Sequence, residues 1–289
     1  MFFWWLLFAF LLGLVNGYDS GSPFVHLEIQ GTYSCSGTTF GTRYIITAAH
    51  CFYLSNKHCE DPNFGITHTN LHVDKEDVLV DVGGMCLPTK NLDIQCHAEA
   101  IPKRFKVTHV MVIKKYVDSR CAEGDVAVLR LEEQFEDRHV VLGQFDTAPN
   151  VLSVFGFGND PSNPDHSQYL QFHEFETSKC KHENVGDDSF CTIESSKGNV
   201  CDGDSGGPLM EIGENYTLYG TVSRGSNCQI MKNRKRRALM KLRGNINIKI
   251  DSYAHILCGI PDIFGEDVPY GCENWIHKLD ASTNQLIIY

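Results

Sequence analysis

The sequence has no excess of positive charge: 25 Lys and Arg residues stand against 36 Asp and Glu residues, for a net charge of −11. Because nucleic-acid-binding domains are usually basic, this balance argues against a nucleic-acid partner. The sequence also lacks any CxxC pair, so we do not expect a zinc site. Beyond its first residues it has no apolar run long enough to span a membrane, and no membrane partner is expected.

Residues 1–17 read as a secretory signal peptide. Residues 2–15 are almost wholly apolar, a stretch too short for a membrane span and typical of a leader, although the usual basic residues before it are missing. Cleavage after Gly17 and cleavage after Gly13 are the two options. We expect a secreted, extracellular protein in which the 12 cysteines form disulfides rather than remain free thiols.

The most informative stretch is residues 201–208, which read CDGDSGGP. A serine hydroxyl is a good nucleophile only when a base takes its proton and donors stabilise the oxyanion. Glycines around Ser205 let the backbone turn sharply, so the N–H groups of Gly203 and Ser205 can be those donors. Asp204 is a candidate buried charge that needs a cationic partner. A plain surface turn is the alternative interpretation, but the full string is too rare to favour it.

This string resembles the nucleophile loop of the trypsin/chymotrypsin serine peptidases. The resemblance implies an upstream base and an orienting acid in the order His, Asp, Ser. The sequence TAAHC at 47–51 is similar to the family's histidine motif, and GDVAVLRL at 124–131 is similar to its aspartate motif. His50 is then the general base, Asp125 orients it, and Ser205 attacks the substrate.

The resemblance implies an all-β fold, with two antiparallel β-barrels of the chymotrypsin type and a short C-terminal helix. We expect the first barrel at residues 18–135, the second at 136–258 and a tail at 259–289, with the active site in the cleft between the barrels.

The likeness weakens near the C-terminus. A basic insert at 231–244 stands where the family has a short loop. An exposed loop, a processing site for a protease that cuts at basic pairs, and an addition to the sequence are the three interpretations. Two segments, 253–258 and 273–279, compete for the role of the closing helix.

Three disulfides are implied by the resemblance. They are Cys35–Cys51, which braces the histidine, Cys180–Cys191, and Cys201–Cys228, which closes the walls of the specificity pocket. The resemblance does not assign the other six cysteines, which are Cys59, Cys86, Cys96, Cys121, Cys258 and Cys272. Several pairings are open to them, and Cys258 with Cys272 is one of these. The sequence has one N-glycosylation motif, at Asn215, where we expect a surface glycan.

The stretch VSRG at 222–225 resembles the pocket wall whose backbone pairs with substrate as an added strand. Ser223 and Gly225 are therefore assigned to substrate binding. Arg224 stands where the family normally has Trp, which argues against an apolar subsite there. The pocket floor corresponds to Asn199, and a neutral amide cannot compensate a buried Lys or Arg. We predict a neutral substrate residue before the scissile bond (P1), of unspecified size.

Asp204 has a further role implied by the resemblance. In the family, cleavage after a basic residue frees an N-terminal amine, which pairs with this aspartate and orders the oxyanion hole. No Lys or Arg precedes Arg43, which already lies in the expected first barrel. Cleavage before Leu14 exposes LVNG, which resembles the family's mature start, whereas a start at Tyr18 leaves Asp204 without its partner.

We interpret the chain as a secreted serine endopeptidase that acts on protein or peptide substrates through an acyl-enzyme, needs no cofactor or metal, is a monomer, and is open to protein inhibitors. A catalytically silent homologue that binds protein partners is the first alternative, favoured by Arg224 and the basic insert. An α/β-hydrolase esterase is the second, and it fails because it requires a GxSxG motif and the order Ser, Asp, His.

Overall fold

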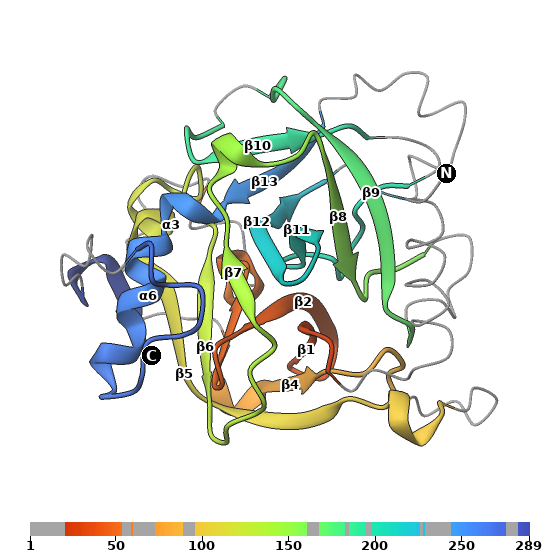
Figure 1. Ribbon diagram of the computed structural model, residues 1–289, viewed down its shortest axis with the longest axis vertical. Coiled ribbons are helices and arrows are strands. Elements are labelled where there is room, and N and C mark those ends of the chain that lie inside the picture. The colour runs from red at the N-terminus through yellow and green to blue at the C-terminus, as the bar shows by residue number, and fades with distance from the viewer. Residues whose placement is uncertain are drawn as a thin grey trace.

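The structure is a computed structural model that describes residues 21–53, 59, 73–88, 96–160, 168–182, 185–194, 198–225, 228, 244–275 and 283–289. The expected leader at 1–17 lies outside the described residues, as does the basic insert apart from Gly244. Two β-barrels make up most of the described chain, with helices α3 (Lys114–Asp118) and α6 (Ala254–Ile263) on one flank (Figure 1). The predicted all-β fold of two barrels with a short C-terminal helix is confirmed.

The first barrel is a closed ring of antiparallel strands. Alternate residues of its first strand, Val25, Leu27 and Ile29, are fully buried, while His26 and Glu28 lie between them on the outer face. The ring closes where the fifth and sixth strands pair. Its strands are β1 (Phe24–Ile29), β2 (Tyr33–Phe40), β3 (Tyr44–Thr47), β4 (Val78–Val82), β5 (Lys103–Ile113) and β6 (Ala127–Leu131).

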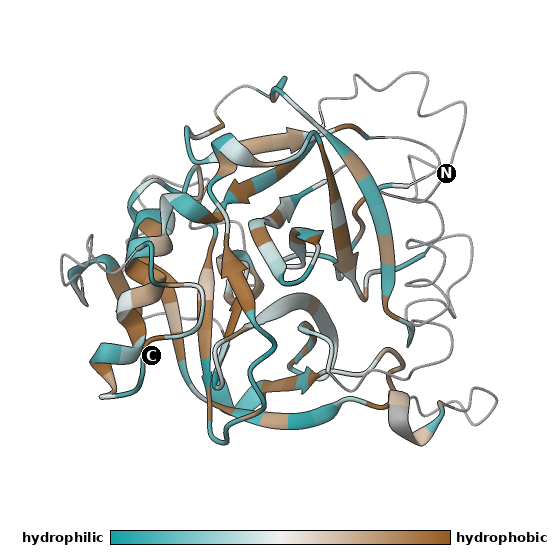
Figure 2. Cartoon of the chain, in the orientation of Figure 1, coloured by the Kyte–Doolittle hydropathy of each residue, from teal (hydrophilic) through white to brown (hydrophobic). Residues whose placement is uncertain are grey.

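The second barrel repeats this plan and closes through the pairing of β11 with β12. Its strands are β8 (Val151–Gly156), β9 (Gln171–Ser178), β10 (Ser189–Thr192), β11 (Pro208–Ile212), β12 (Tyr216–Arg224) and β13 (Asn245–Lys249). An extra strand, β7 (Val140–Leu142), joins β12 in parallel. Figure 2 shows β9 as mostly hydrophilic, as expected for a strand with a solvated outer face.

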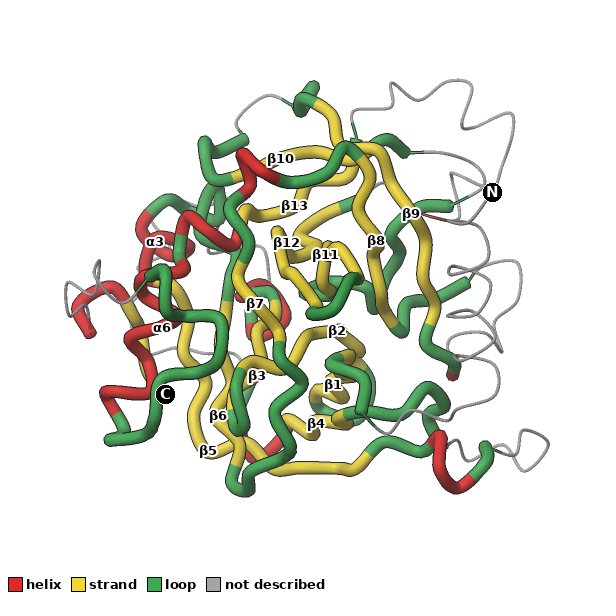
Figure 3. The backbone as a smooth tube through the Cα atoms, viewed as in Figure 1, coloured by secondary structure: helices red, strands yellow, loops and turns green. Residues whose placement is uncertain are grey.

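Short 3-10 helices connect several strands, and helical segments are few in the described part of the chain (Figure 3). They are η1 (Ala49–Phe52), η2 (Lys75–Asp77), η3 (Ala98–Ala100), η4 (Phe145–Thr147), η6 (Ile250–Ser252) and η8 (Thr283–Gln285). No helix in the described part of the chain is long and apolar enough to cross a membrane.

Each barrel has its own apolar core, and a further cluster joins the two. Leu27 and Leu129 belong to the first core, and Leu152 belongs to the second. Between the barrels, the rings of Phe24 and Phe155 stack with centroids 4.0 Å apart. Burial of such aromatic surface favours one relative position of the barrels, and this fixes the cleft between them.

The C-terminal residues differ from the expected division. The helix that we expected at 253–258 begins at Ala254 and continues to Ile263, past the boundary at 258. The last strand, β14 (Leu286–Ile288), pairs antiparallel with β5, so it extends the sheet of the first barrel rather than forming a separate tail. The physical reason is burial, because Leu286 and Ile287 are both only 8% exposed there.

All 12 cysteines form disulfides in the structure. Three are the pairs that the resemblance implied: Cys35–Cys51, Cys180–Cys191 and Cys201–Cys228. The other three are Cys59–Cys121, Cys86–Cys96 and Cys258–Cys272. Of these, Cys59–Cys121 ties the segment that follows the histidine motif to the loop that precedes the aspartate motif.

Candidate active site

Three polar side chains from the two barrels meet in the cleft. His50 lies in η1, just after β3, Asp125 precedes β6, and Ser205 occupies the turn before β11. Nδ1 of His50 lies 2.8 Å from Oδ2 of Asp125, and Nε2 of His50 lies 2.8 Å from Oγ of Ser205. Because a carboxylate only accepts, Nδ1 carries the proton and Nε2 is the acceptor that faces the Ser205 hydroxyl.

The environment of Asp125 keeps it ionised. Its side chain is buried and accepts hydrogen bonds from the backbone N–H of His50 (2.9 Å, at Oδ1) and from the hydroxyl of Ser223 (at Oδ2). Burial alone disfavours the carboxylate, but the adjacent imidazole and these hydrogen bonds hold the pKa of Asp125 below its ordinary value. The carboxylate can therefore orient and stabilise a protonated His50.

The pKa of His50 reflects opposing influences. Burial disfavours the imidazolium, the charge and hydrogen bond of Asp125 favour it, and the positive charge of Arg224 opposes it. The carboxylate outweighs the rest, so the pKa of His50 is raised above its ordinary value. A base of this kind can take a proton from Ser205 and later return it to a leaving group.

The loop that carries Ser205 depends on glycine. Gly203 and Gly206 adopt φ values of +101° and +80°, which favour glycine. At Gly206, an added β-carbon would stand 2.1 Å from Oγ1 of Thr47. Within the described chain, no acceptor takes the backbone N–H of Gly203 or of Ser205. Both N–H groups can thus donate to an oxygen of a bound substrate.

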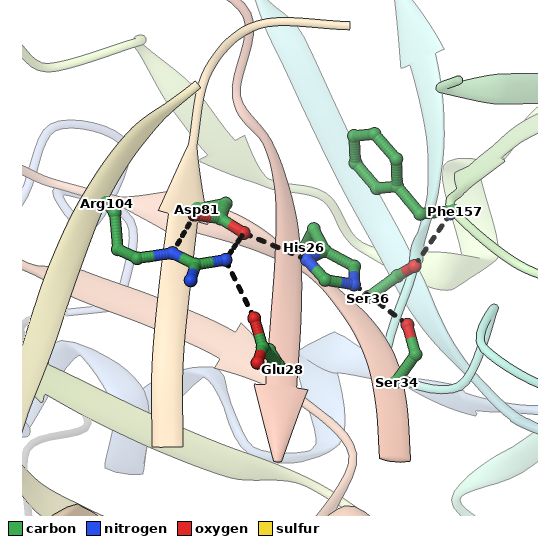
Figure 4. A network of polar contacts seen from close by, with 7 residues as sticks. All are labelled: His26, Glu28, Ser34, Ser36, Asp81, Arg104 and Phe157. Carbon is green, nitrogen blue, oxygen red and sulfur yellow. Dashed lines mark hydrogen bonds and ion pairs between the residues drawn. The ribbon is translucent and has the colours of Figure 1, made fainter. Parts of the chain in front are cut away.

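Ser36, at 1% exposure, binds this loop from the first barrel, and the sequence reasoning missed it. Its hydroxyl donates to the carbonyl oxygen of Gly203 (2.8 Å) and accepts from the backbone N–H of Phe157 (3.0 Å; Figure 4). Its backbone N–H donates to the carbonyl oxygen of Ser205 (2.8 Å). No pattern in the sequence announces these contacts, because the partners lie more than a hundred residues away in the chain.

A second Ser–His–Asp row lies on the outside of the first barrel (Figure 4). His26 lies 2.9 Å from Oγ of Ser34 through Nε2 and 3.1 Å from Asp81 through Nδ1. Here Arg104 donates to both oxygens of Asp81 (2.8 Å each) and also binds Glu28. Because Arg104 already compensates the charge of Asp81, we interpret this row as a cross-link between β1, β2, β4 and β5.

Asp204 accepts two backbone hydrogen bonds. Oδ1 binds the N–H of Gly158 and Oδ2 binds the N–H of Cys201, each at 2.9 Å. Burial raises the pKa of Asp204 to about 6. Among the described residues no cation pairs with it, and residues 1–20 lie outside that set. The expected pairing of Asp204 with an N-terminal amine stays a prediction.

A cavity of about 270 Å³ adjoins Ser205. It is lined by Val200, Cys201, Asp202, Ser205, Val222, Ser223, Arg224 and Gly225. Ser223 and Gly225 both line this cavity, and their role in substrate binding stays a prediction. Asn199 is half-buried and not among the lining residues; its side-chain nitrogen lies 4.0 Å from Sγ of Cys228. Its role as the pocket floor stays a prediction.

Val200 and Gly225, from the two walls of this cavity, lie close to each other. A β-carbon added at Gly225 would stand 2.5 Å from Cγ2 of Val200 and 2.9 Å from Oδ1 of Asn245. Val200 is buried, at 4% exposure, and so is Asn245. The Val200 side chain therefore narrows the space beside Gly225.

Asp188, in the second barrel, braces the loop that precedes Asp125. Its Oδ2 accepts hydrogen bonds from the backbone N–H of Gly124 (2.7 Å) and from the hydroxyl of Tyr253. The sequence offers no signal for this contact, which joins segments 64 residues apart.

Asn215, the predicted glycosylation site, lies in the turn between β11 and β12, and its glycan stays a prediction.

A family model described as Trypsin matches residues 16–96 and 69–236 of the chain, which together exceed half its length. The chain belongs to the trypsin family of serine peptidases. The trypsin-like protease try-5 of Caenorhabditis elegans is 28% identical over 230 residues, which cover 67% of this chain and 68% of that protein. Trypsin delta of Drosophila erecta is 26% identical over 219 residues, which cover 71% and 73% of the two chains.

A third relative of this trypsin-family chain carries additional sequence. The CLIP domain-containing serine protease B9 of Anopheles gambiae is 27% identical over 216 residues, which cover 68% of this chain and 50% of that protein. The ranges matched by the family model contain the motifs that carry His50, Asp125 and Ser205.

Proposed function

We propose that the chain is a serine endopeptidase that hydrolyses peptide bonds through an acyl-enzyme, with His50, Asp125 and Ser205 as its catalytic residues and without a cofactor. The observation that carries this proposal is the position of His50, which lies 2.8 Å from Ser205 on one side and 2.8 Å from Asp125 on the other. Nucleophile, base and orienting acid at these distances form the arrangement that activates a serine.

The reaction follows from these contacts. The proton of the Ser205 hydroxyl passes to Nε2 of His50 as Oγ bonds to the carbonyl carbon, and the electron pair of the C=O bond moves to the oxygen. The N–H groups of Gly203 and Ser205 stabilise this oxyanion. When it collapses, the C–N bond breaks and the amine leaves with the proton from His50. Water, deprotonated by His50, then cleaves the acyl ester in the same way.

The lining of the cavity supports a neutral and small P1 residue. Val200 lies beside Gly225 in the cavity lining, and its side chain takes up space that a long P1 side chain would need. In addition, Asp202 is the one acidic residue among the described residues that line the cavity. Its side chain is exposed to solvent rather than buried beneath the pocket. A buried Lys or Arg side chain therefore has no carboxylate to compensate its charge.

We propose that the protein acts outside the cell on protein or peptide substrates. The apolar stretch at 2–15 and the six disulfides support secretion, because disulfides persist in oxidising compartments. Protein inhibitors that occupy the cleft are the expected antagonists. We propose a monomer, and gel filtration of the secreted protein is its direct test.

A catalytically silent homologue is the second candidate, favoured by the raised pKa of Asp204 and the absence of a cation beside it in the described chain. An aryl phosphonate that reacts only with an activated serine distinguishes the two. If the enzyme proposal holds, the secreted protein is labelled and hydrolyses a small peptide ester, whereas the Ser205→Ala variant does neither. An unlabelled but correctly folded protein favours the silent homologue.

A further inference from the structure

Arg224 is a charged residue at the wall of the cavity that adjoins Ser205. It is the last residue of β12 and pairs with Ile246 of β13. The register of this pairing shifts between Val222 and Arg224, and such bulges re-aim the side chains beside them. Around this shift, Ser223 bonds Asp125 inside the protein, while Arg224 is exposed. The strand thus presents a cation to the open cleft.

The guanidinium of Arg224 forms no ion pair within the described structure. No carboxylate among the residues that the structure describes lies within ion-pair distance of its guanidinium. Asp202 lines the same cavity but forms no bond with it. The charge acts on the active site, because it opposes protonation of the nearby His50. By contrast, Arg43, Arg104 and Arg130 each bind at least one carboxylate.

We propose that Arg224 is a specificity-determining residue, which binds a carboxylate side chain of the peptide substrate on the acyl side of the scissile bond. This inference rests on the proposed function and refines it: the substrate class becomes peptides with Glu or Asp at P2, P3 or P4. The guanidinium fits a carboxylate well, because its N–H groups form a fork that can donate to both oxygens.

We place the acyl side of the substrate beside this strand, because residues 223–225 line the cavity that we assign to the P1 residue. If a peptide pairs with the backbone at 223–225 as an added strand, the residues before its scissile bond run beside Arg224. The net charge of −11 repels acidic peptides at long range, but salt screens that repulsion within about 8 Å at physiological ionic strength. Contact with Arg224 therefore decides the preference once the peptide is in the cleft, and high salt weakens the preference.

A peptide series with a fixed small neutral P1 residue tests the proposal. Glu, Gln and Lys are placed in turn at each position from P4 to P3′, and kcat/KM is measured for the wild type and for Arg224→Gln. We expect Glu to exceed Gln by about fivefold at one of P2 to P4 in the wild type, the upper range for an exposed ion pair, and to lose that advantage in the variant. Equal rates for Glu and Gln at P2 to P4 overturn the proposal.

Charge reversal separates recognition from a structural role. The Arg224→Glu variant should prefer Lys at the same position, which a loss of folding cannot produce. Lys106→Gln, which removes one charge at an exposed site of β5, serves as the matched control and should keep the wild-type preference. A preference that survives in Arg224→Glu contradicts the inference. If the wild type cleaves no peptide and takes no phosphonate label, the proposed function itself has failed.

Discussion

The hydroxyl of Ser36 donates a 2.8 Å hydrogen bond to the carbonyl oxygen of Gly203, so the first barrel holds the oxyanion loop of the second. Gly203 adopts φ of +101°, and its N–H is one of the two proposed oxyanion donors. The carbonyl of Gly203 belongs to the planar peptide unit that joins Gly203 to Asp204, and this unit lies between the two proposed donors, the N–H groups of Gly203 and Ser205. Holding that unit in place restricts the directions of both donors. Ser36 is therefore a positioning residue for the proposed reaction.

Replacement of Ser36 by Ala should lower kcat about tenfold with little change in KM, because it removes a buried hydrogen bond that orients a transition-state donor. Steady-state kinetics on a peptide ester measures this split. Ser34→Ala is the matched control, since Ser34 lies two residues earlier on β2 and bonds His26 instead of the loop. Equal losses of kcat in the two variants would argue against a positioning role for Ser36.

The pH dependence of kcat/KM should follow the titration of His50. Only the neutral imidazole can accept the Ser205 proton, so activity rises with pH through the pKa of His50, which lies above its ordinary value. Replacing Asp125 by Asn removes the charge that raises this pKa. The acidic limb then moves to lower pH and kcat falls by about 10⁴-fold. Full pH–rate profiles of both proteins provide the measurement.

Arg224→Gln should move the acidic limb of the pH–rate profile to higher pH, opposite to the shift expected for Asp125→Asn. The positive charge of Arg224 lowers the pKa of His50, so its loss raises that pKa and moves the rise in activity to higher pH. The profile is measured with a neutral substrate, so that recognition of a carboxylate plays no part. An unmoved or downward-shifted limb contradicts the electrostatic contact between the two side chains.

Asp204 should make stability depend on the mature N-terminus. In the folded protein its pKa is about 6, which exceeds the ordinary value. Its contribution to the free energy of unfolding is therefore fully present below about pH 4 and is lost as pH rises through 6. The loss reaches up to about 3 kcal/mol, unless an amine pairs with the carboxylate. Urea unfolding at pH 4 and 7.5 should reveal the loss in a protein that begins at Tyr18 and not in one that begins at Leu14.

The outcome for these two forms also tests the activation route. If the Leu14 amine is the partner of Asp204, the form that begins there should be the active one, and its activity should fall at alkaline pH as the amine loses its proton. N-terminal sequencing that finds Tyr18 in a fully active preparation rules out this route.

Val200→Ala should widen the choice of P1 residue. The Val200 side chain meets the opposite wall at Gly225, so its truncation deepens the cavity. We expect kcat/KM for a Leu substrate to rise about tenfold relative to an Ala substrate, which is the scale that pocket methyl groups give. Gly225→Ala should do the reverse and lower activity on both substrates, because its added β-carbon has no room. A P1 profile dominated by Lys and Arg would overturn the neutral pocket.

The sequence predicted the features that depend on local motifs. The glycines around Ser205 and the TAAHC and GDVAVLRL strings led to His50, Asp125 and Ser205 before any contact was known. Three of the six disulfides followed from the same likeness. Contacts between distant segments could not be predicted, because no periodicity or spacing records them.

Ser36 and Asp188 are examples, because each binds a backbone group on the other barrel. Neither residue type is unusual at its position, so neither stands out in the sequence. The pairing of β14 with β5 was missed for a related reason. The short apolar run at 286–288 is compatible with a strand, but the sequence does not show which strand it pairs with.

The reactivity of Ser205 tests most directly whether His50 and Asp125 activate it as a nucleophile. The secreted protein is treated with an aryl phosphonate, digested, and analysed by mass spectrometry to locate the adduct. We predict one adduct, on the peptide that contains Ser205, with loss of peptidase activity in proportion to labelling and far slower labelling in His50→Ala. A folded protein in which Ser205 stays unmodified, or an adduct that persists in Ser205→Ala together with activity, would contradict it.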